Sequence, residues 1–409
     1  MEFLPYVYLT YMFISLYMLS LFLIIYFRNK HRFFLYPELT KNYSVSFISP
    51  AYNEEATIKE TIEHIFAIDY DNIEELIIIN DKSSDNTQQI VESLLLKYPK
   101  LKIINNEHNL GKAGSLNRAW PLAKSEIVVV VDADSFPKED SLKKMLGYFD
   151  NPRVGAVTCP VLVRNKNTFW SKLQHIEYIA ISFGRKLLEY VDAIYVTPGP
   201  LALYRKTALQ DIEGFDEKNM TEDIEATWHL AYNNWDRKMC LSTGVSSEVP
   251  TKLKPWFIQR RRWNIGGLQC IKKYWHILGK KGMLGIFILP FFILNMFLGL
   301  VGLGIFTYLI TTRFILNYLS AKYSIIANTP MLTLNELFIT PSILNYLGII
   351  LFAAGLIYLL LIMSILGEKI KTKENILNIP FYLILYLILY PFIMINALWH
   401  FYRGKYVWR

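Results

Sequence analysis

The sequence predicts an α/β domain with a mostly parallel sheet, inserted among membrane-spanning helices. The first observation is a mean hydropathy of +0.23, which reflects long apolar runs near both ends of the chain. Each run is long enough to cross a bilayer. The second is the region between the runs, where strand-like and helix-like segments alternate as they do in parallel sheets. The third is that polar residues follow the strands, so we expect them to gather at one edge of the sheet.

The first apolar run, Pro5 to Phe27, is expected to remain in the protein as a membrane span. It has no basic segment before it and no small-residue cleavage site, so it does not resemble a cleaved signal peptide. Arg28, Lys30 and Arg32 follow the run, and positive flanks of this kind place the next domain in the cytoplasm. Further spans are expected at about 284–312, 343–366 and 376–402.

Four parts of the chain follow from these patterns. They are an N-terminal span with its basic flank (1–32), a cytoplasmic α/β domain (45–250), interfacial helices (251–281) and a C-terminal membrane region of about three spans (284–409). The net charge of +8 owes much to residues beside the spans, which indicates an anionic lipid surface rather than nucleic acid. The 3 cysteines are far apart and no histidine pair has ligand spacing, so zinc and haem sites are not expected.

Apolar runs bounded by turn residues define the expected elements of the domain. Strands are predicted at 45–50, 75–80, 101–105 and 127–131, and helices at 57–66, 87–98 and 111–123. A strand at 154–163, an amphipathic helix at 168–188 and a bent segment leading into a strand at 196–204 follow. Thr221 is expected to cap the next helix, and basic and aromatic residues at 251–281 predict a helix in the membrane interface.

Two carboxylates, Asp132 and Asp134, follow the central strand Ile127–Val131. At the carboxyl edge of a parallel sheet they would suit a hard divalent cation that also binds a diphosphate. The alternative is an acidic turn in which Asp134 or Ser135 caps a following helix. The motif alone does not decide between the two.

Six short motifs occur in a fixed order along the chain. They are Pro50-Ala-Tyr-Asn-Glu54, Asn80-Asp81 with Ser83 to Asp85, Gly111-Lys112 with Leu116-Asn117, Asp132-Ala-Asp134, Thr221-Glu-Asp223 and Gln259-Arg-Arg-Arg-Trp263. With these motifs the chain, from about 45 to 268 with the flanking spans, resembles the family 2 membrane glycosyltransferases, which include cellulose, hyaluronan and poly-N-acetylglucosamine synthases. The second motif begins Asn80-Asp81 where many relatives have two aspartates. The segment 262–267 resembles the poly-N-acetylglucosamine synthase branch most.

The resemblance implies a GT-A-type, Rossmann-like domain that binds a UDP-linked nucleotide sugar. Mg²⁺ or Mn²⁺ would bind Asp134, helped by Asp132, and act as a Lewis acid on the leaving diphosphate. The residues implied in nucleotide-sugar binding are Ala51, Tyr52, Glu54, Asp81, Lys112, Asp132, Gln259 and Arg262. The residues themselves also allow Lys112 to be a solvated loop lysine and Glu54 to begin a helix.

Catalysis is assigned by the same resemblance to Asp223, as the general base, with Glu222 beside it. One base and one displacement would invert the configuration at the sugar. Trp263, Thr221 and Gly199 would contact the acceptor. The alternatives are helix-dipole stabilisation by the two acids and interfacial anchoring by Trp263 and its arginines; Arg260 and Arg261 are assigned to that anchoring role.

The function expected from these features is an inverting, metal-dependent glycosyltransferase in the plasma membrane. It would extend a β-linked polysaccharide and pass it through its own spans, with an accessory secretion subunit or homo-oligomer as further partner and no nucleic acid. The rival within the class adds one sugar to a membrane lipid. A rival from another class is a non-catalytic sensor of nucleotide sugars or a scaffold.

Overall fold

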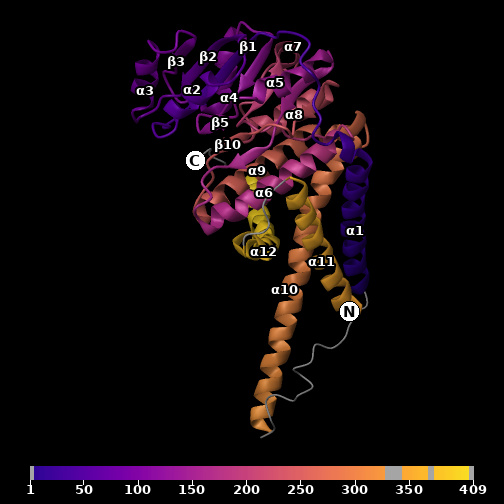
Figure 1. The fold of residues 1–409 in the computed structure, drawn as a ribbon. Coiled ribbons are helices and arrows are strands. Elements are labelled where there is room, and N and C mark those ends of the chain that lie inside the picture. Colours follow the sequence, from indigo (N-terminus) through magenta and orange to yellow (C-terminus); the bar gives the residue numbers. More distant parts are fainter. Residues whose placement is uncertain (1–3, 328–342, 367–372, 405–409) are drawn as a thin grey trace.

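The computed structural model describes residues 4–327, 343–366 and 373–404. An α/β domain forms one end of the molecule and long apolar helices form the other (Figure 1). The helices α6 (Phe169–Glu189) and α9 (Leu253–Tyr274) lie between the two.

A seven-stranded sheet of order β3-β2-β1-β4-β8-β6-β9 forms the centre of the α/β domain. Its first four strands are mutually parallel, and β8 runs antiparallel to β4 and β6. The mostly parallel α/β prediction is therefore confirmed. The strands are β1 (Val45–Ala51), β2 (Ile73–Asn80), β3 (Leu101–Asn105), β4 (Ile127–Val130), β6 (Val154–Thr158), β8 (Ala202–Arg205) and β9 (Asp236–Met239).

Both faces of this sheet are buried at β1, β2, β4 and β6, which explains the nearly continuous apolar runs in these strands. Val129 of β4 packs into one core cluster, whereas Val128 and Val130 pack into the other. Burial of one such side chain contributes about 1.5–3 kcal/mol. The covering helices are α2 (Ile58–Phe66), α3 (Thr87–Leu94), α4 (Gly111–Ala119), α5 (Ser141–Met145), α7 (Lys206–Asp211) and α8 (Glu222–Tyr232).

The predicted strand 154–163 is wrong in its extent, because it is divided between two sheets. After β6 the chain turns at Cys159-Pro160 and continues as β7 (Val161–Val163). In a small second sheet, β10 (Val245–Ser247) pairs with both β7 and β5 (Ser135–Pro137). Since Ser135 begins a strand and the next helix starts at Ser141, the helix-capping alternative for Asp134 and Ser135 is also wrong.

Four described helices are long and apolar enough to cross a membrane, in agreement with the predicted spans. They are α1 (Leu4–Asn29), α10 (Leu289–Ile326, continuing a π-helical turn at Leu284–Ile288), α11 (Ile343–Ile365) and α12 (Lys373–Arg403). The expected membrane region 284–409 also contains 328–342, 367–372 and 405–409, which lie outside the described residues. Pro380 and Pro391 lie within α12 without ending it, so the possibility that they break this segment is not realised.

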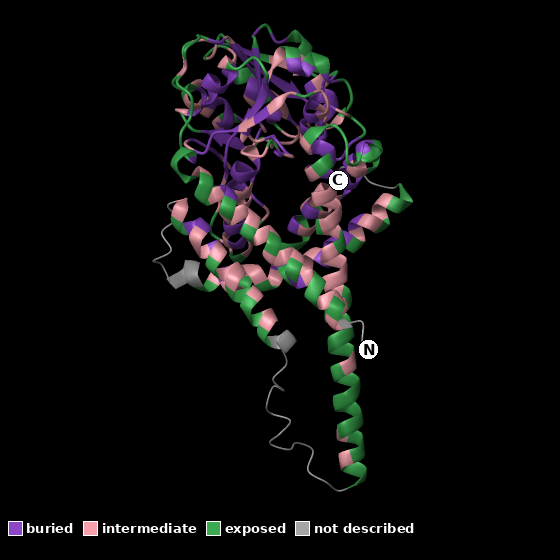
Figure 2. Cartoon of the chain, turned by 90° about the vertical axis from the view of Figure 1, so that its right-hand side faces the viewer, coloured by how far each residue is buried: buried purple, intermediate pink, exposed green. Residues whose placement is uncertain are grey.

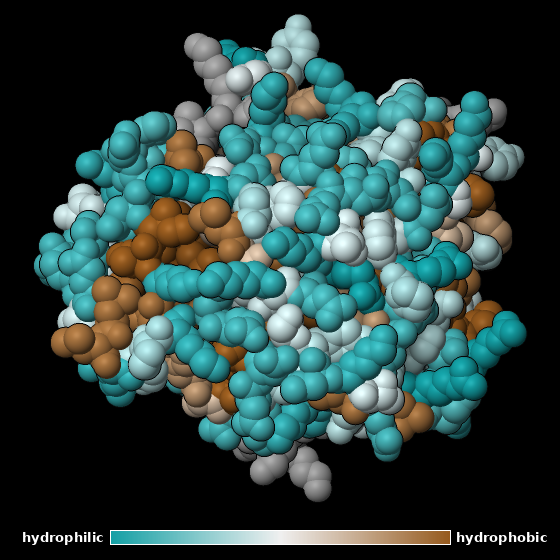
Figure 3. Space-filling model, turned by 90° about the horizontal axis from the view of Figure 1, so that it is seen from above, coloured by the Kyte–Doolittle hydropathy of each residue, from teal (hydrophilic) through white to brown (hydrophobic). Residues whose placement is uncertain are grey.

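The exposure pattern separates the two ends of the molecule. Large apolar residues of α10 are exposed, such as Phe314 at 72%. Figure 2 shows much of this long helix in the colour of exposed residues. The opposite end, seen from above, is mostly hydrophilic with one larger hydrophobic patch (Figure 3). Extended apolar surface on long helices beside a hydrophilic domain indicates a membrane protein.

Candidate active site

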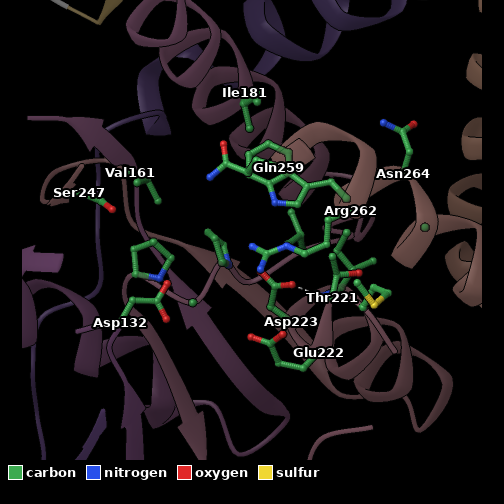
Figure 4. Close-up of a pocket in the computed structure, with 18 of the residues that line it drawn as sticks. Asp132, Val161, Ile181, Thr221, Glu222, Asp223, Ser247, Gln259, Arg262 and Asn264 are labelled. Atoms are coloured by element: carbon green, nitrogen blue, oxygen red, sulfur yellow. Dashed lines mark hydrogen bonds between the residues drawn. The ribbon is translucent and has the colours of Figure 1, made fainter. Parts of the chain in front are cut away.

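One cavity of about 980 Å³ brings together every site residue predicted from the sequence. It opens where the loops after the strands meet α8, α9 and the membrane helices. The predicted residues that line it are Ala51, Tyr52, Glu54, Asp81, Lys112, Asp132, Asp134, Gly199, Thr221, Glu222, Asp223, Gln259, Arg262 and Trp263. Figure 4 shows the side chains of Gln259, Arg262, Asp132, Glu222 and Asp223 around this space. The expected gathering of polar loops at one sheet edge is therefore present.

Asp81, at the end of β2, is buried and organises the neighbouring loop. Its carboxylate accepts hydrogen bonds from the backbone N–H of Leu110 (2.8 Å) and Gly111 (2.9 Å) and from the amide of Asn106 (2.8 Å). These bonds fix the turn that begins α4, which places Lys112 in the first turn of that helix. Asp81 thus stabilises the loop before α4, a structural role in addition to the nucleotide contact predicted for it.

The loops after β1 and β2 are held together by reciprocal hydrogen bonds. The Asn53 amide oxygen accepts from the backbone N–H of Ser84 at 2.8 Å, and the Thr87 hydroxyl accepts from the N–H of Glu54 at 2.8 Å. Asn53 adopts a left-handed conformation with φ of 56°, which asparagine tolerates. Glu54 precedes rather than begins α2, which starts at Ile58.

Lys112 lies at the centre of a charged cluster and is not a solvated loop lysine. Its Nζ is 2.5 Å from Asp132 Oδ1 and 2.9 Å from Glu222 Oε1. Burial alone would lower the pKa of Lys112, but the two carboxylates raise it above its ordinary value. Gly199 packs against this cluster, because a Cβ there would collide with Lys112 Nζ and lie 3.0 Å from Asp132 Oδ1.

The remaining carboxylates differ in their preference for a proton. Burial and the charge of Asp132 raise the pKa of Asp134 to about 6. Burial and the charge of Glu222 raise the pKa of Asp223 to about 6. Burial would also raise the pKa of Glu222, but Lys112 reverses that effect and lowers it. The pKa values of the adjacent acids Glu222 and Asp223 are thus shifted in opposite directions. Of these two acids, Asp223 is the one able to take a proton near neutral pH.

Asp132 and Asp134 fit a divalent cation that shares its coordination with a ligand. The described residues include no cluster of three or more His, Cys, Asp or Glu side chains that could enclose a metal. Magnesium-type sites commonly use one or two carboxylates together with substrate phosphates and water. Burial, and after it the like charge of Asp132, raises the pKa of Asp134, and a cation at this position would neutralise that like charge.

Thr221 joins the acidic motif to α9 and does not cap α8 with its side chain, contrary to prediction. Its hydroxyl donates instead to the amide oxygen of Asn219 at 3.2 Å. Gly266 of α9 lies directly against Thr221, because a Cβ at Gly266 would overlap the threonine side chain. The helix that carries Gln259, Arg262 and Trp263 is therefore in close contact with the segment that carries Asp223.

The interfacial anchoring predicted for Arg260 is wrong, because Arg260 is fully buried and forms an ion pair with Glu177 of α6. Arg261 contacts α12 through Asn396 (3.4 Å) and His400 (3.2 Å). Helical spacing places both arginines off the face shared by Gln259 and Trp263. No sequence signal identifies their partners, since Asn396 and His400 lie in a distant segment.

Several residues that were not predicted line the cavity from α6 and the membrane helices. Arg185 of α6 is 5% exposed, and its Nε and Nη1 atoms have no hydrogen-bond partner among the described residues. Burial lowers the pKa of this guanidinium. The membrane helices contribute Phe291, Phe292, Asn295, Met296 and Gly299 of α10 and Tyr386, Leu387, Tyr390, Pro391 and Met394 of α12. The amphipathic pattern of α6 and the apolar length of α10 and α12 predict helices but do not show that these helices reach the site.

Comparison with known proteins agrees with this site and fold. Residues 46–213 match the model of glycosyl transferase family 2. A poly-β-1,6-N-acetyl-D-glucosamine synthase of Staphylococcus epidermidis is 33% identical over 284 residues, which is 68% of each chain. A β-monoglucosyldiacylglycerol synthase of Trichormus variabilis is 33% identical over 244 residues, 58% of this chain and 52% of that relative.

A solved structure shares the fold across nearly the whole chain. The mannosyltransferase of Pyrobaculum calidifontis, determined with GDP-Man and Mn²⁺, superposes with a TM-score of 0.60 at 18% identity and covers 97% of this chain and 99% of its own. The expected GT-A-type fold is thereby confirmed. The chain belongs to glycosyl transferase family 2 and is a membrane glycosyltransferase.

Proposed function

We propose that the protein transfers a sugar from a UDP-linked nucleotide sugar to a growing β-linked polysaccharide, with inversion, and passes the product through its own spans. The observation that carries this proposal is the continuity of the cavity. The same space is lined by the carboxylates Asp132, Asp134 and Asp223, by Trp263, and by side chains of the membrane helices α10 and α12. A chain extended at Asp223 would therefore leave between membrane helices.

The sheet edge supplies the donor half of the proposed site. Ala51, Tyr52, Glu54 and Asp81 would contact the base and ribose. A Mg²⁺ or Mn²⁺ ion on Asp134 and Asp132 would supply Lewis acidity toward the leaving diphosphate. Lys112 and Arg262 would stabilise its negative charge, and Gln259 would add a hydrogen bond. Pairing of Lys112 with Asp132 and Glu222 fixes the ammonium group beside the carboxylates before the donor binds.

Asp223 is the proposed general base for the acceptor hydroxyl. Its pKa of about 6 leaves it largely deprotonated at neutral pH but still basic enough to accept a proton. Glu222, which is ion-paired with Lys112, would position that lysine rather than take the proton. Trp263 offers an aromatic face for the acceptor sugar, with Thr221 and Gly199 on neighbouring walls.

Orientation and domain roles follow from the same proposal. The positive residues Arg28, Lys30 and Arg32 at the end of α1 support a plasma-membrane protein whose catalytic domain, 45–250, lies in the cytoplasm, where nucleotide sugars are available. Residues 1–32 and 284–409 would hold the domain in the membrane, and 251–281 would form the interface. An accessory secretion subunit or a second copy of the chain would be a further partner.

A second candidate is transfer of one sugar to a membrane lipid. Two observations favour it: apolar residues of the spans, such as Phe292 and Met394, line the cavity, and one group of relatives is named for synthesis of a glucosylated diacylglycerol. A lipid acceptor could enter between the same helices from the bilayer. The form of the product therefore distinguishes the two candidates.

The test is incubation of the purified, detergent-solubilised full chain with Mn²⁺ and a panel of radiolabelled nucleotide sugars, with and without added lipid. Products are sorted by size and by extraction into organic solvent. A high-molecular-weight product from one donor would support the polysaccharide synthase and identify its sugar. A small, extractable product that requires added lipid would favour the second candidate. Absence of product and of nucleotide release with every donor would contradict both.

A further inference from the structure

A buried ionic cluster joins the interfacial helices to a membrane helix behind the active site. Glu177 of α6 and Arg260 of α9 are 2% and 0% exposed. Arg260 Nε donates to Glu177 Oε1 at 3.0 Å, and Arg260 Nη2 pairs with Glu177 Oε2. From α12, the hydroxyls of Tyr386 and Tyr390 donate to the two oxygens of Glu177 at 2.8 and 3.1 Å. We call these four residues the Glu177 cluster.

Arg260 connects the Glu177 cluster to two residues of α9 that line the cavity, Gln259 and Trp263. Gln259 and Trp263 are four residues apart and share one face of the helix, whereas Arg260 points away toward α6. Arg260 nevertheless contacts both neighbours. Its Nη1 donates to the side-chain oxygen of Gln259 at 2.5 Å, and its guanidinium lies 4.0 Å from the centre of the Trp263 ring.

We propose that Glu177, acting through Arg260, is a positioning residue that fixes the orientation of Gln259 and Trp263 for glycosyl transfer. The inference rests on the proposed function of the cavity and adds three residues outside the predicted site: Glu177, Tyr386 and Tyr390. It also gives Arg260 a role other than the anchoring expected from the sequence.

The contact with Gln259 determines which end of its amide faces the substrate. A guanidinium can only donate hydrogen bonds, so the Gln259 oxygen must face Arg260 and its NH₂ group is left for the cavity. Gln259 therefore presents donors, which suit the oxygen atoms of a diphosphate or a sugar hydroxyl. Without Arg260 the amide could turn over and present its oxygen to the same ligand atoms.

The contact with Trp263 has an analogous effect on the aromatic ring. Arg260 covers one face of the Trp263 indole, and Trp263 also lines the cavity. A cation on one face holds the plane of the ring in place and leaves its other face for a sugar. Because Tyr386 and Tyr390 of α12 also line the cavity and bond to Glu177, the orientation of this ring depends on the position of a membrane helix.

Stability alone is a poor explanation for the cluster. Replacing a buried ion pair with apolar residues of similar volume is often neutral or stabilising, whereas removing one partner leaves an uncompensated charge. The informative variant is therefore Glu177→Met/Arg260→Met, which removes both charges together. Its control is Lys186→Met/Glu189→Met, which removes another nearly buried pair of α6, joined at 2.7 Å.

The experiment measures thermal stability, donor affinity and steady-state glycosyl transfer for the full chain in detergent. We expect the Glu177/Arg260 double variant to fold and to bind UDP within a few-fold of wild type, but to lose about 100-fold in kcat, the effect of misplacing catalytic groups by about 1 Å. The Lys186/Glu189 control should keep its kcat. A stable double variant with wild-type kcat would overturn the proposal.

Addition of Gln259→Ala and Trp263→Ala to the double variant separates positioning from a general structural effect. If the cluster acts through these two residues, their loss lowers kcat little further in the double variant although it lowers kcat strongly in wild type. Independent, multiplicative effects would overturn the proposal. Failure of the proposed function is distinguishable, because the wild-type protein itself would then form no product.

Discussion

At the scale of single residues, the chemistry depends on how neighbouring carboxylates are neutralised. Glu222 and Asp223 are adjacent in sequence, yet Glu222 is held by Lys112 while Asp223 is not ion-paired with that lysine. The same lysine also holds Asp132. Lys112 thus lowers the pKa of Glu222, whereas burial and the charge of Glu222 raise the pKa of Asp223 to about 6.

The pH dependence of transfer should report this arrangement. Asp223, the proposed base, would act in its deprotonated form. With a pKa of about 6, this form is fully populated well above pH 6 and is lost as the pH falls through 6. We expect kcat/KM to fall about tenfold per pH unit below that value. The measurement is a rate profile from about pH 8 to about pH 4.5 with saturating Mn²⁺. A rate that stays flat to the acid end of this range, as an aspartate with an ordinary pKa of about 3.9 would give, would contradict the assignment.

A substitution at Gly199, which packs against Lys112 and Asp132, tests whether this charged cluster binds the donor. Alanine at this position would displace Lys112 Nζ and approach Asp132, so Gly199→Ala should weaken donor binding about tenfold, or about 1.4 kcal/mol. The measurement is the Kd for UDP in the presence of Mn²⁺. Gly184→Ala is the control, because a Cβ built there meets no atom of another described segment within 4 Å. Equal affinities in both variants would show that Lys112 does not contact the donor.

At the scale of elements, the site is assembled by the contact of α9 with the segment before α8. Gly266 allows this contact, because any side chain would overlap Thr221. Gly267, the next residue, has room: a Cβ there would lie 3.6 Å from Phe292, an ordinary contact. The two adjacent glycines in one helix therefore form a matched pair.

We expect Gly266→Ala to separate α9 from Thr221, to destabilise the fold by about 1–3 kcal/mol and to abolish most transfer activity. Gly267→Ala should be neutral or stabilise the helix by up to about 1 kcal/mol. Thermal unfolding and transfer rate, measured on both variants, check the prediction. Similar behaviour of the two variants would mean that the close approach at Thr221 is not required.

Elements with a strong local pattern were predictable, whereas elements defined by distant partners were not. The strands β1, β2, β3 and β4 were predicted within a few residues. The apolar runs of β1, β2 and β4 are nearly continuous because both faces of the sheet are buried there. The division between β6 and β7 was not predicted, because both halves are apolar. Pro160 lies between them and is a local signal for a break, and β7 then pairs with β10 in the second sheet. The uninterrupted course of α12 past Pro380 and Pro391 likewise has no local sequence signal.

At the scale of the whole molecule, the location of the predicted site residues followed from topology. Loops after parallel strands must meet at one edge, so the motifs that follow β1, β2, β3 and β4 could be expected together. They line one cavity, which the predicted residues of α8 and α9 also line. The burial of Arg260 could not be predicted, because its partner Glu177 lies 83 residues away. Nor could the burial of Arg185, whose Nε and Nη1 have no hydrogen-bond partner among the described residues, or the contribution of α10 and α12, since helical periodicity does not specify which faces meet.

The same view of the whole molecule relates the site to the membrane. The α/β domain supplies the charged half of the cavity and the spans supply its apolar half, with α6 and α9 between them (Figure 1). A soluble acceptor would not need the apolar half. The arrangement therefore favours an acceptor that remains in contact with the membrane region throughout transfer.

The most direct test of this account is the turnover of Asp223→Asn in the full chain, measured beside its affinity for the donor. We predict that nucleotide release and product formation fall by about 10²–10⁴-fold, while the Kd for the nucleotide sugar changes only a few-fold. This result would establish Asp223 as the base of a glycosyltransferase whose donor site is formed by other residues. Wild-type turnover in the variant, or an equal loss of donor binding, would contradict the account.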